Sequence, residues 1–263
     1  MKRVEMFDCP FDVASMNETV ELIGERIASG TFTQHVVVNV AKLVHMRKDP
    51  RLAAAVRACD IINVDGMGVV WGARMLGHQV RERVAGIDLF DELLGLATRQ
   101  GIPVFLLGSK PEVVEKTVIV VRERHPGIPL AGWHHGYFWD DEEATVELIR
   151  RSGAKMLFVA ITSPKKEVFI ERWNEKLGVS FVMGVGGTFD VVAGKVSRAP
   201  RWMQQSGLEW AYRVIQEPRR MWRRYLVTNS AFAWMLLKEL VKSSAWRRSS
   251  GVGRRRNENG GGQ

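Results

Sequence analysis

Residues 61–70 read Ile-Ile-Asn-Val-Asp-Gly-Met-Gly-Val-Val, and this stretch decides the fold class. Residues 61–64 have the composition of a short buried strand, and the chain turns at Asp65-Gly66 into a helical segment. Residues 35–40 form a second apolar run of strand length. Strands that are apolar on both faces, with helices between them, indicate a mostly parallel sheet covered on both sides.

The same alternation extends in both directions from this stretch. Ser15 and Glu18 resemble a capping box that opens a helix to about Ala28. We expect further strands near residues 104–107, 130, 156–161 and 181–184, and helices near residues 49–58, 112–124, 142–151 and 164–177. The sequence therefore predicts an α/β fold with a Rossmann-like sheet and helices on both faces.

Composition narrows the function classes. The 263 residues are 46% apolar, enough for a sizeable core, and the only cysteines, Cys9 and Cys59, lie in no metal-binding or disulfide pattern. The N-terminus lacks the long apolar run of a signal peptide. The net charge is −1 for residues 1–196 and +10 for residues 197–263. A neutral body with a basic tail predicts an anionic partner surface.

The charge and composition of the sequence divide the chain into three predicted segments. Residues 1–196 form the catalytic α/β domain, residues 197–248 form a basic helical appendage, and residues 249–263 are expected to be disordered. Pro218 can open a helix to about Val241 that is too short and too polar for a confident membrane span. Its arginines and tryptophans favour a membrane surface first, oligomer packing second and nucleic acid third.

Asp65 is the leading candidate for a catalytic base, because a carboxylate at a strand end can accept a proton from an attacking hydroxyl. The alternative is a helix N-cap, since aspartate is favoured there and before glycine in turns. Chemistry alone favours the cap by about two to one.

Two glycine-containing strand ends are candidate ligand sites. Gly108 precedes a helix start that suits a diphosphate, although an ordinary turn looks the same. Gly186, Gly187 and Thr188 either cradle a sugar or phosphate or form a tight turn. Neither segment has the GxGxxG or P-loop pattern.

Arg83 and Asp88 also allow two interpretations. Arg83 is suited to neutralising a leaving diphosphate without a metal, whereas a solvated arginine with Asp88 as a helix cap is slightly favoured. The acidic run at residues 140–143 is not the Asp-x-Asp arrangement that holds a divalent cation. No metal or other cofactor is expected.

These pieces together resemble the WecG/TagA/CpsF glycosyltransferases, which include N-acetylmannosaminyltransferases. The resemblance runs from Phe7 to about Tyr225. Its most specific stretches are Asp65-Gly66-x-Gly-Val-Val-Trp71, Arg83-Val-Ala-Gly-x-Asp88-Leu89, Gly186-Gly-Thr-Phe-Asp190-x-x-Ala-Gly194, Arg198-Ala-Pro200 and Gly207-Leu-Glu-Trp210, with Glu217-Pro-Arg-Arg220 behind them.

The resemblance implies that Asp65 is the base of an inverting, metal-independent transfer, with Asn39 in the same pocket and Arg83 at the diphosphate. The donor would be a UDP-sugar and the acceptor an undecaprenyl-diphosphate-linked saccharide in surface polysaccharide synthesis. The appendage would hold the enzyme on the cytoplasmic face of the inner membrane, with a possible homo-oligomer and no nucleic acid. Candidates for completing the site are Arg213, Arg220 and Arg224.

Two departures from the family pattern bear on the sugar. Val37 stands where many relatives have threonine, and Lys166 replaces a glutamine. A lost hydroxyl and an added cation leave N-acetylmannosamine, a hexose and a uronic acid open. The alternatives to a transferase are a nucleotide-dependent oxidoreductase on the same fold and a basic membrane-binding or nucleic-acid-binding scaffold.

Overall fold

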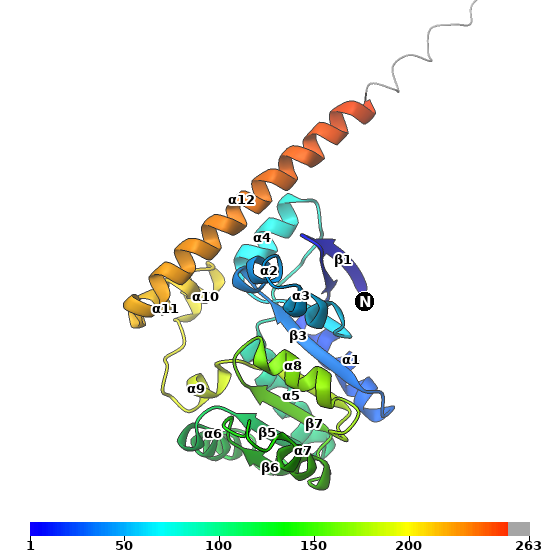
Figure 1. Cartoon of the computed structure of the whole chain (residues 1–263), viewed down its shortest axis with the longest axis vertical. Helices are drawn as coiled ribbons and strands as arrows, with labels where there is room; N and C mark the ends of the chain where they lie inside the picture. Colours follow the sequence, from blue (N-terminus) through cyan, green and yellow to red (C-terminus); the bar gives the residue numbers. More distant parts are fainter. Residues whose placement is uncertain (252–263) are drawn as a thin grey trace, which may run out of the picture.

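A computed structural model describes residues 1–251, apart from the side chains of Arg220 and residues 243–251. Residues 252–263, most of the tail predicted to be disordered, lie outside the described residues. The centre is a six-stranded, wholly parallel sheet in the order β4-β3-β8-β7-β5-β6 (Figure 1). The strands are β3 (Thr33–Val38), β4 (Ile61–Val64), β5 (Val104–Gly108), β6 (Leu130–His134), β7 (Met156–Ala160) and β8 (Phe181–Gly184). The predicted Rossmann-like α/β fold is confirmed.

Helices cover both faces of this sheet. One face packs against α1 (Met16–Ala28), α5 (Gly86–Gln100) and α6 (Pro111–Arg124), and the other against α3 (Pro50–Arg57), α7 (Glu142–Arg151) and α8 (Lys165–Trp173). Side chains alternate accordingly along β5, because Val104 and Leu106 enter one core cluster and Phe105 and Leu107 the other. The predicted capping box of α1 is present in full, with Ser15 and Glu18 bonded reciprocally.

Three short helices follow the carboxyl ends of strands: α2 (Val40–Met46) after β3, α4 (Met67–Met75) after β4, and α9 (Thr188–Val192) after β8. The sequence predicts β3 to continue to Val40, but the strand ends at Val38 and Asn39 begins α2. An asparagine interrupts the apolar run there, and its side chain caps the helix. All six strand ends lie at one edge of the sheet, where open α/β folds bind ligands.

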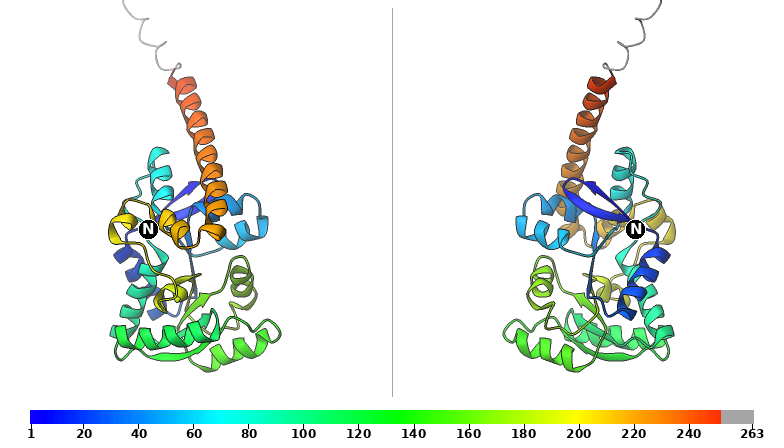
Figure 2. Two further views of the ribbon diagram at one scale, coloured as in Figure 1. Left: turned by 90° about the vertical axis from the view of Figure 1, so that its left-hand side faces the viewer. Right: turned by 90° about the vertical axis from the view of Figure 1, so that its right-hand side faces the viewer.

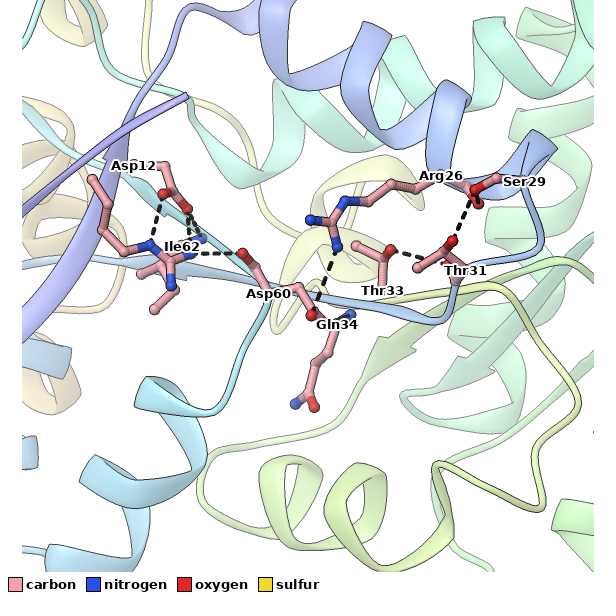
Figure 3. A network of polar contacts seen from close by, with 9 residues as sticks. Asp12, Arg26, Ser29, Thr31, Thr33, Gln34, Asp60 and Ile62 are labelled. Carbon is pink, nitrogen blue, oxygen red and sulfur yellow. Dashed lines mark hydrogen bonds and ion pairs between the residues drawn. The ribbon is translucent and has the colours of Figure 1, made fainter.

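An antiparallel hairpin of β1 (Lys2–Met6) and β2 (Cys9–Val13) lies beside edge strand β4 and was not predicted. Asp12 on β2 accepts hydrogen bonds from the backbone N–H of Ile62 (2.9 Å) and from Arg3 (2.8 Å) (Figure 3). Asp60 likewise accepts from the N–H of Gln34 at 2.8 Å. These carboxylates satisfy backbone donors near the sheet edge and tie the hairpin to the core.

The C-terminal region forms three helices, α10 (Arg201–Gln205), α11 (Glu209–Gln216) and α12 (Pro218–Gly251). The predicted helix start at Pro218 is confirmed, and the helix continues past Val241. Its first half lies along α2 and α4, where the Phe232 ring lies close to Gly72, and its second half extends away from the body (Figures 1 and 2). Across residues 1–251, every helix is too short or too polar to traverse a bilayer.

Helix α12 has two apolar faces. Met221, Phe232 and Met235 are buried against the body. On the opposite side of the helix, large side chains face solvent instead: Trp222, Leu226, Val227, Trp234, Leu237 and Val241. Exposed apolar residues on this scale are characteristic of a surface that meets a partner or a membrane.

Candidate active site

Asp65 lies directly after β4, and it does not cap the helix that follows. The N-cap of α4 is Gly66, whose φ of 97° suits glycine, and no side chain caps this helix. The cap interpretation of Asp65 is therefore wrong. Because Gly66 makes the turn, the Asp65 carboxylate is left available at the sheet edge.

The surroundings of Asp65 favour its protonated form more than water does. Asp65 is half-buried, and burial, followed by the charge of Glu209, raises its pKa from 3.8 to about 6. Arg83 and the backbone N–H of Gly86 act in the opposite direction, and Asp88 adds a smaller upward push. A carboxylate with this pKa is ionised at neutral pH and is a stronger base than a solvated aspartate.

Asn39 and Val37 lie beside Asp65, because Val38 of β3 pairs with Val64 of β4. The Oδ1 atom of Asn39 accepts the backbone N–H of Lys42 at 2.9 Å, which caps α2 and fixes the side chain. Val37 packs close to Gly86, since a Cβ at Gly86 would meet Val37 Cγ2 at 3.3 Å. The residue that departs from the family pattern therefore stands next to a backbone donor to Asp65.

Arg83 belongs to a chain of ion pairs that joins the body to the C-terminal region. Its Nη1 donates to Glu209 Oε2 of α11 at 2.6 Å, and its side chain is only 14% exposed. The Nη1 and Nη2 atoms of Arg198 donate to the two carboxylate oxygens of Asp88 at 2.5 and 2.7 Å. The Nε atom of Arg198 lies 3.9 Å from Glu209 Oε1. The expected role of Asp88 as a cap is wrong: Ala85 is the N-cap of α5, and Asp88 pairs with Arg198 instead.

A cavity of about 380 Å³ lies beside this chain of ion pairs rather than over Asp65. Asp88 and Arg198 form part of its wall, together with Arg124 of α6 and the segment around Gly194. Asp65 and Arg83 do not line it. The candidate chemistry is therefore at the open strand ends rather than in this cavity.

Lys166 forms a separate buried cluster with Glu167 and Lys42. The Nζ atoms of Lys166 and Lys42 lie 3.4 and 3.5 Å from the same Glu167 oxygen, and each of the three side chains is at most 12% exposed. Burial and the nearby Lys166 lower the pKa of Lys42 to about 8. Burial alone would raise the pKa of Glu167, but the two lysines bring it below its ordinary value. The Lys166 stem packs over Gly184, at the end of β8.

The two glycine-containing strand ends are tight turns. Gly108 abuts the backbone of β7, where a Cβ would meet Ala160 O at 2.5 Å. Thr188 donates its hydroxyl to the Val185 carbonyl at 2.8 Å, within the turn that contains Gly186 and Gly187. Gly108 is four strands away from β4, or roughly 19 Å at the usual strand spacing. It is not brought next to Asp65.

The C-terminal region approaches the site through α11 and α12. Burial raises the pKa of Tyr225, and the charges of Glu209 and Asp65 add to this effect while Arg213 and Arg224 oppose it. Two predicted appendage arginines thus share an electrostatic environment with the candidate base. The side chain of the third, Arg220, lies outside the described residues.

No group of three or more histidine, cysteine, aspartate or glutamate side chains within the described part of the chain is arranged to hold a metal ion. Cys9 and Cys59 are free thiols, and both are buried.

Comparison with known families decides the identity at the family level. The model of the WecG/TagA/CpsF glycosyl transferase family matches residues 4–245, nearly the whole chain. The chain belongs to the WecG/TagA/CpsF glycosyltransferase family. Membership makes it a transferase of cell-surface polysaccharide synthesis, and the family implies a nucleotide-sugar donor and a lipid-linked acceptor.

Within this glycosyltransferase, sequence reasoning missed Glu209, Arg198 and Tyr225 as neighbours of Asp65. Glu209 and Arg198 lie inside stretches that carry the family resemblance, and their place in these stretches is the one sequence signal that could have pointed to a functional role. Their roles were hidden because residues 83, 88, 198 and 209 meet only after folding.

Proposed function

We propose that this glycosyltransferase moves a sugar from a UDP-sugar to an undecaprenyl-diphosphate-linked saccharide with inversion at the anomeric carbon. Asp65 removes the proton from the acceptor hydroxyl as that oxygen attacks, and UDP leaves from the opposite face. One displacement by a deprotonated acceptor inverts the configuration. The reaction needs no metal ion if arginines neutralise the leaving diphosphate.

The observation that carries this proposal is the environment of Asp65. The carboxylate is at the sheet edge where α/β folds bind ligands, is not used as a cap, and has a pKa of about 6. A perturbed carboxylate at such an edge is characteristic of an acid–base residue.

Arg83 is proposed to contact the donor diphosphate, and Asn39 to lie beside the sugar. Arg213, Arg220 and Arg224 are proposed to add positive charge from the appendage. The electrostatic influence of Arg213 and Arg224 on Tyr225, which also senses Asp65, supports an approach of this kind. Gly108, Gly186, Gly187 and Thr188 are weaker candidates, because tight-turn packing already accounts for them.

The sugar is proposed to be an N-acetylmannosamine-like sugar, a hexose or a uronic acid. Lys42, Lys166 and Glu167 carry a net positive charge close to the ends of β3, β7 and β8. This surplus supports a carboxylated sugar or an additional phosphate contact through Lys166. Val37 offers no hydroxyl to the same region.

The enzyme is proposed to work as a peripheral protein on the cytoplasmic face of the bacterial inner membrane, with the region after residue 196 as its contact with anionic lipid. The solvent-facing tryptophans of α12 and the charge of +10 after residue 196 support this arrangement. A homo-oligomer formed through α12 is a further part of the proposal.

The proposal is tested with a panel of UDP-sugars and a synthetic lipid-diphosphate-linked acceptor. UDP release that requires both substrates, with an inverted product, is the expected result. Release independent of the acceptor, or no transfer from any UDP-sugar, would contradict it. Salt-sensitive retention on DNA without any transfer would favour a nucleic-acid scaffold.

A further inference from the structure

We propose that Glu209 is a positioning residue. Before the donor binds, its carboxylate holds Arg83, and when a diphosphate binds Arg83 this carboxylate moves to Arg198. This inference rests on the proposed transferase function, because it takes the donor diphosphate as the ligand of Arg83. Glu209 is the first residue of α11, so the exchange would couple the C-terminal region to donor binding.

The first observation is that Arg83 is already engaged. The Glu209 carboxylate lies 2.6 Å from its Nη1, with the arginine side chain 14% exposed and the glutamate side chain 29% exposed. A charge-assisted hydrogen bond of this length uses donor capacity that a phosphate would also use. A diphosphate that binds Arg83 must compete with Glu209 for it.

The second observation is an unused donor on Arg198. Its Nε is buried without a hydrogen bond, although two other guanidinium nitrogens hold Asp88. The second oxygen of Glu209 lies 3.9 Å from this Nε, slightly too far for a hydrogen bond. A buried donor without a partner carries an energetic penalty, and a small shift of the Glu209 side chain would remove it.

The third observation is the balance of charge around Asp65. Charged groups act on Asp65 from several elements: Arg83 before α5, Asp88 on α5, Arg198 before α10 and Glu209 on α11. The Tyr225 phenol on α12 senses Asp65 together with Arg213 and Arg224. Asp65, Asp88 and Glu209 therefore face the guanidinium groups of Arg83 and Arg198, with Arg213 and Arg224 further along the appendage. While Glu209 holds Arg83, that guanidinium is not free for a diphosphate, so a shift of Glu209 to Arg198 makes Arg83 available.

The same charge acts on the proton affinity of Asp65. After burial, Glu209 is the largest influence that raises the pKa of this carboxyl. Removal of the Glu209 charge should therefore lower the pKa of Asp65, so that activity persists to lower pH. A purely structural role for Glu209 would not move the acid limb in this direction.

The test compares the wild type, Glu209→Gln and Glu209→Asp with the control Glu175→Gln, an exposed glutamate between α8 and β8 at the opposite end of the strands. Binding of UDP and of inorganic pyrophosphate is measured by calorimetry without acceptor, and the pH dependence of kcat/KM by transfer assays. Glutamine keeps the shape of the side chain but removes its charge, and aspartate keeps the charge on a shorter stem.

For Glu209→Gln we expect UDP and pyrophosphate to bind about three- to tenfold more tightly, because the competing carboxylate is gone. We also expect a lower kcat and an acid limb displaced to lower pH. Glu209→Asp should keep the position of the acid limb, and Glu175→Gln should match the wild type throughout. Unchanged or weaker binding of both probes would overturn the inference. An unmoved acid limb would also overturn it, provided that Asp65→Asn shows that Asp65 sets this limb.

Failure of the proposed function is distinguishable from failure of this inference. The binding measurement needs neither acceptor nor turnover, so it reports on the exchange at Arg83 alone. If Asp65 is not the base, the acid limb will be the same in Asp65→Asn as in the wild type, and the pyrophosphate result still decides the role of Glu209.

Discussion

At the residue scale, the proposed role of Asp65 as a base conflicts with its environment. Its carboxylate must be ionised to accept a proton, yet burial and Glu209 make ionisation unfavourable. In the folded state the pKa is about 6, against 3.8 ordinarily, so the folded protein binds more protons than the unfolded chain between about pH 4 and pH 6. Stability contributed by this group is therefore lost as the pH rises through that window.

Replacement Asp65→Asn should consequently stabilise the protein at pH 7.5. We expect a gain of about 1–3 kcal/mol in the free energy of unfolding at pH 7.5 and little change at pH 4. Urea denaturation at the two pH values measures this difference. An equal effect at both pH values would show that ionisation of Asp65 does not destabilise the folded protein.

Glu167 is the opposite of Asp65, because its ionised form stabilises the folded protein. Its buried carboxylate is the shared counter-charge of two buried lysines. Glu167→Gln leaves Lys42 and Lys166 without their shared counter-charge, so we expect a loss of about 2–4 kcal/mol at pH 6.5. The loss should be smaller at pH 9, because Lys42, with a pKa of about 8, can then release its proton. Thermal denaturation at both pH values provides the measurement.

The matched control for Glu167 is Glu171→Gln, an exposed glutamate on the same helix, α8. It should change stability by less than about 0.5 kcal/mol. Similar losses for the two variants would indicate a general effect on α8 rather than a buried charge cluster.

At the scale of elements, α12 is held to the body by one apolar face while it presents a second to solvent. Phe232 is buried close to Gly72 of α4 and makes an edge contact with Phe7, at a centroid distance of 5.7 Å. Trp234, two residues on, is 58% exposed. Substitution of Phe232 therefore tests how α12 packs on the body, and substitution of Trp234 tests the solvent-facing side of the same helix.

Phe232→Ala should lower the free energy of unfolding by about 3 kcal/mol, because it leaves a cavity between α12 and α4. Trp234→Ala should lower it by less than about 1 kcal/mol. Chemical denaturation of both variants checks the packing of α12, and equal losses would contradict it.

Elements with a strong local signal were predictable from the sequence. The Ser15–Glu18 capping box and the strand-like stretch at residues 61–64 each specify their structure within a few residues. The β1–β2 hairpin was not predictable in the same way, because Lys2, Arg3 and Glu5 give β1 the polarity of a loop. Its register depends on distant contacts, such as that of Asp12 with Ile62.

At the scale of the whole molecule, the candidate site consists of a part predictable from sequence and a part that folding creates. The positions of Asn39 and Asp65 follow from the ends of adjacent parallel strands. The contact of Glu209 with Arg83 joins residues 126 positions apart, and no local pattern encodes it. Sequence therefore located the candidate base but not the charged groups that shift its pKa.

The surface of the molecule makes membrane binding testable without disturbing the site. The double variant Trp222→Ser/Trp234→Ser changes only side chains that face solvent on α12. In flotation with phosphatidylglycerol vesicles it should bind about tenfold more weakly, because tryptophan anchors at the interface are lost. Turnover of a water-soluble acceptor analogue should be unaffected.

The control for membrane binding is Ile119→Ser/Tyr137→Ser, which removes two equally exposed apolar side chains from the body. Vesicle binding by this variant should match the wild type. If both double variants bind as the wild type does, the exposed face of α12 is not the membrane contact.

The central claim is that Asp65 is the catalytic base, and transfer by Asp65→Asn beside a measurement of donor affinity tests it most directly. We expect turnover to fall at least about 100-fold, with the donor dissociation constant changed by less than about threefold. The wild-type rate should decline below about pH 6, as the carboxyl becomes protonated. Turnover by Asp65→Asn equal to that of the wild type would contradict the claim.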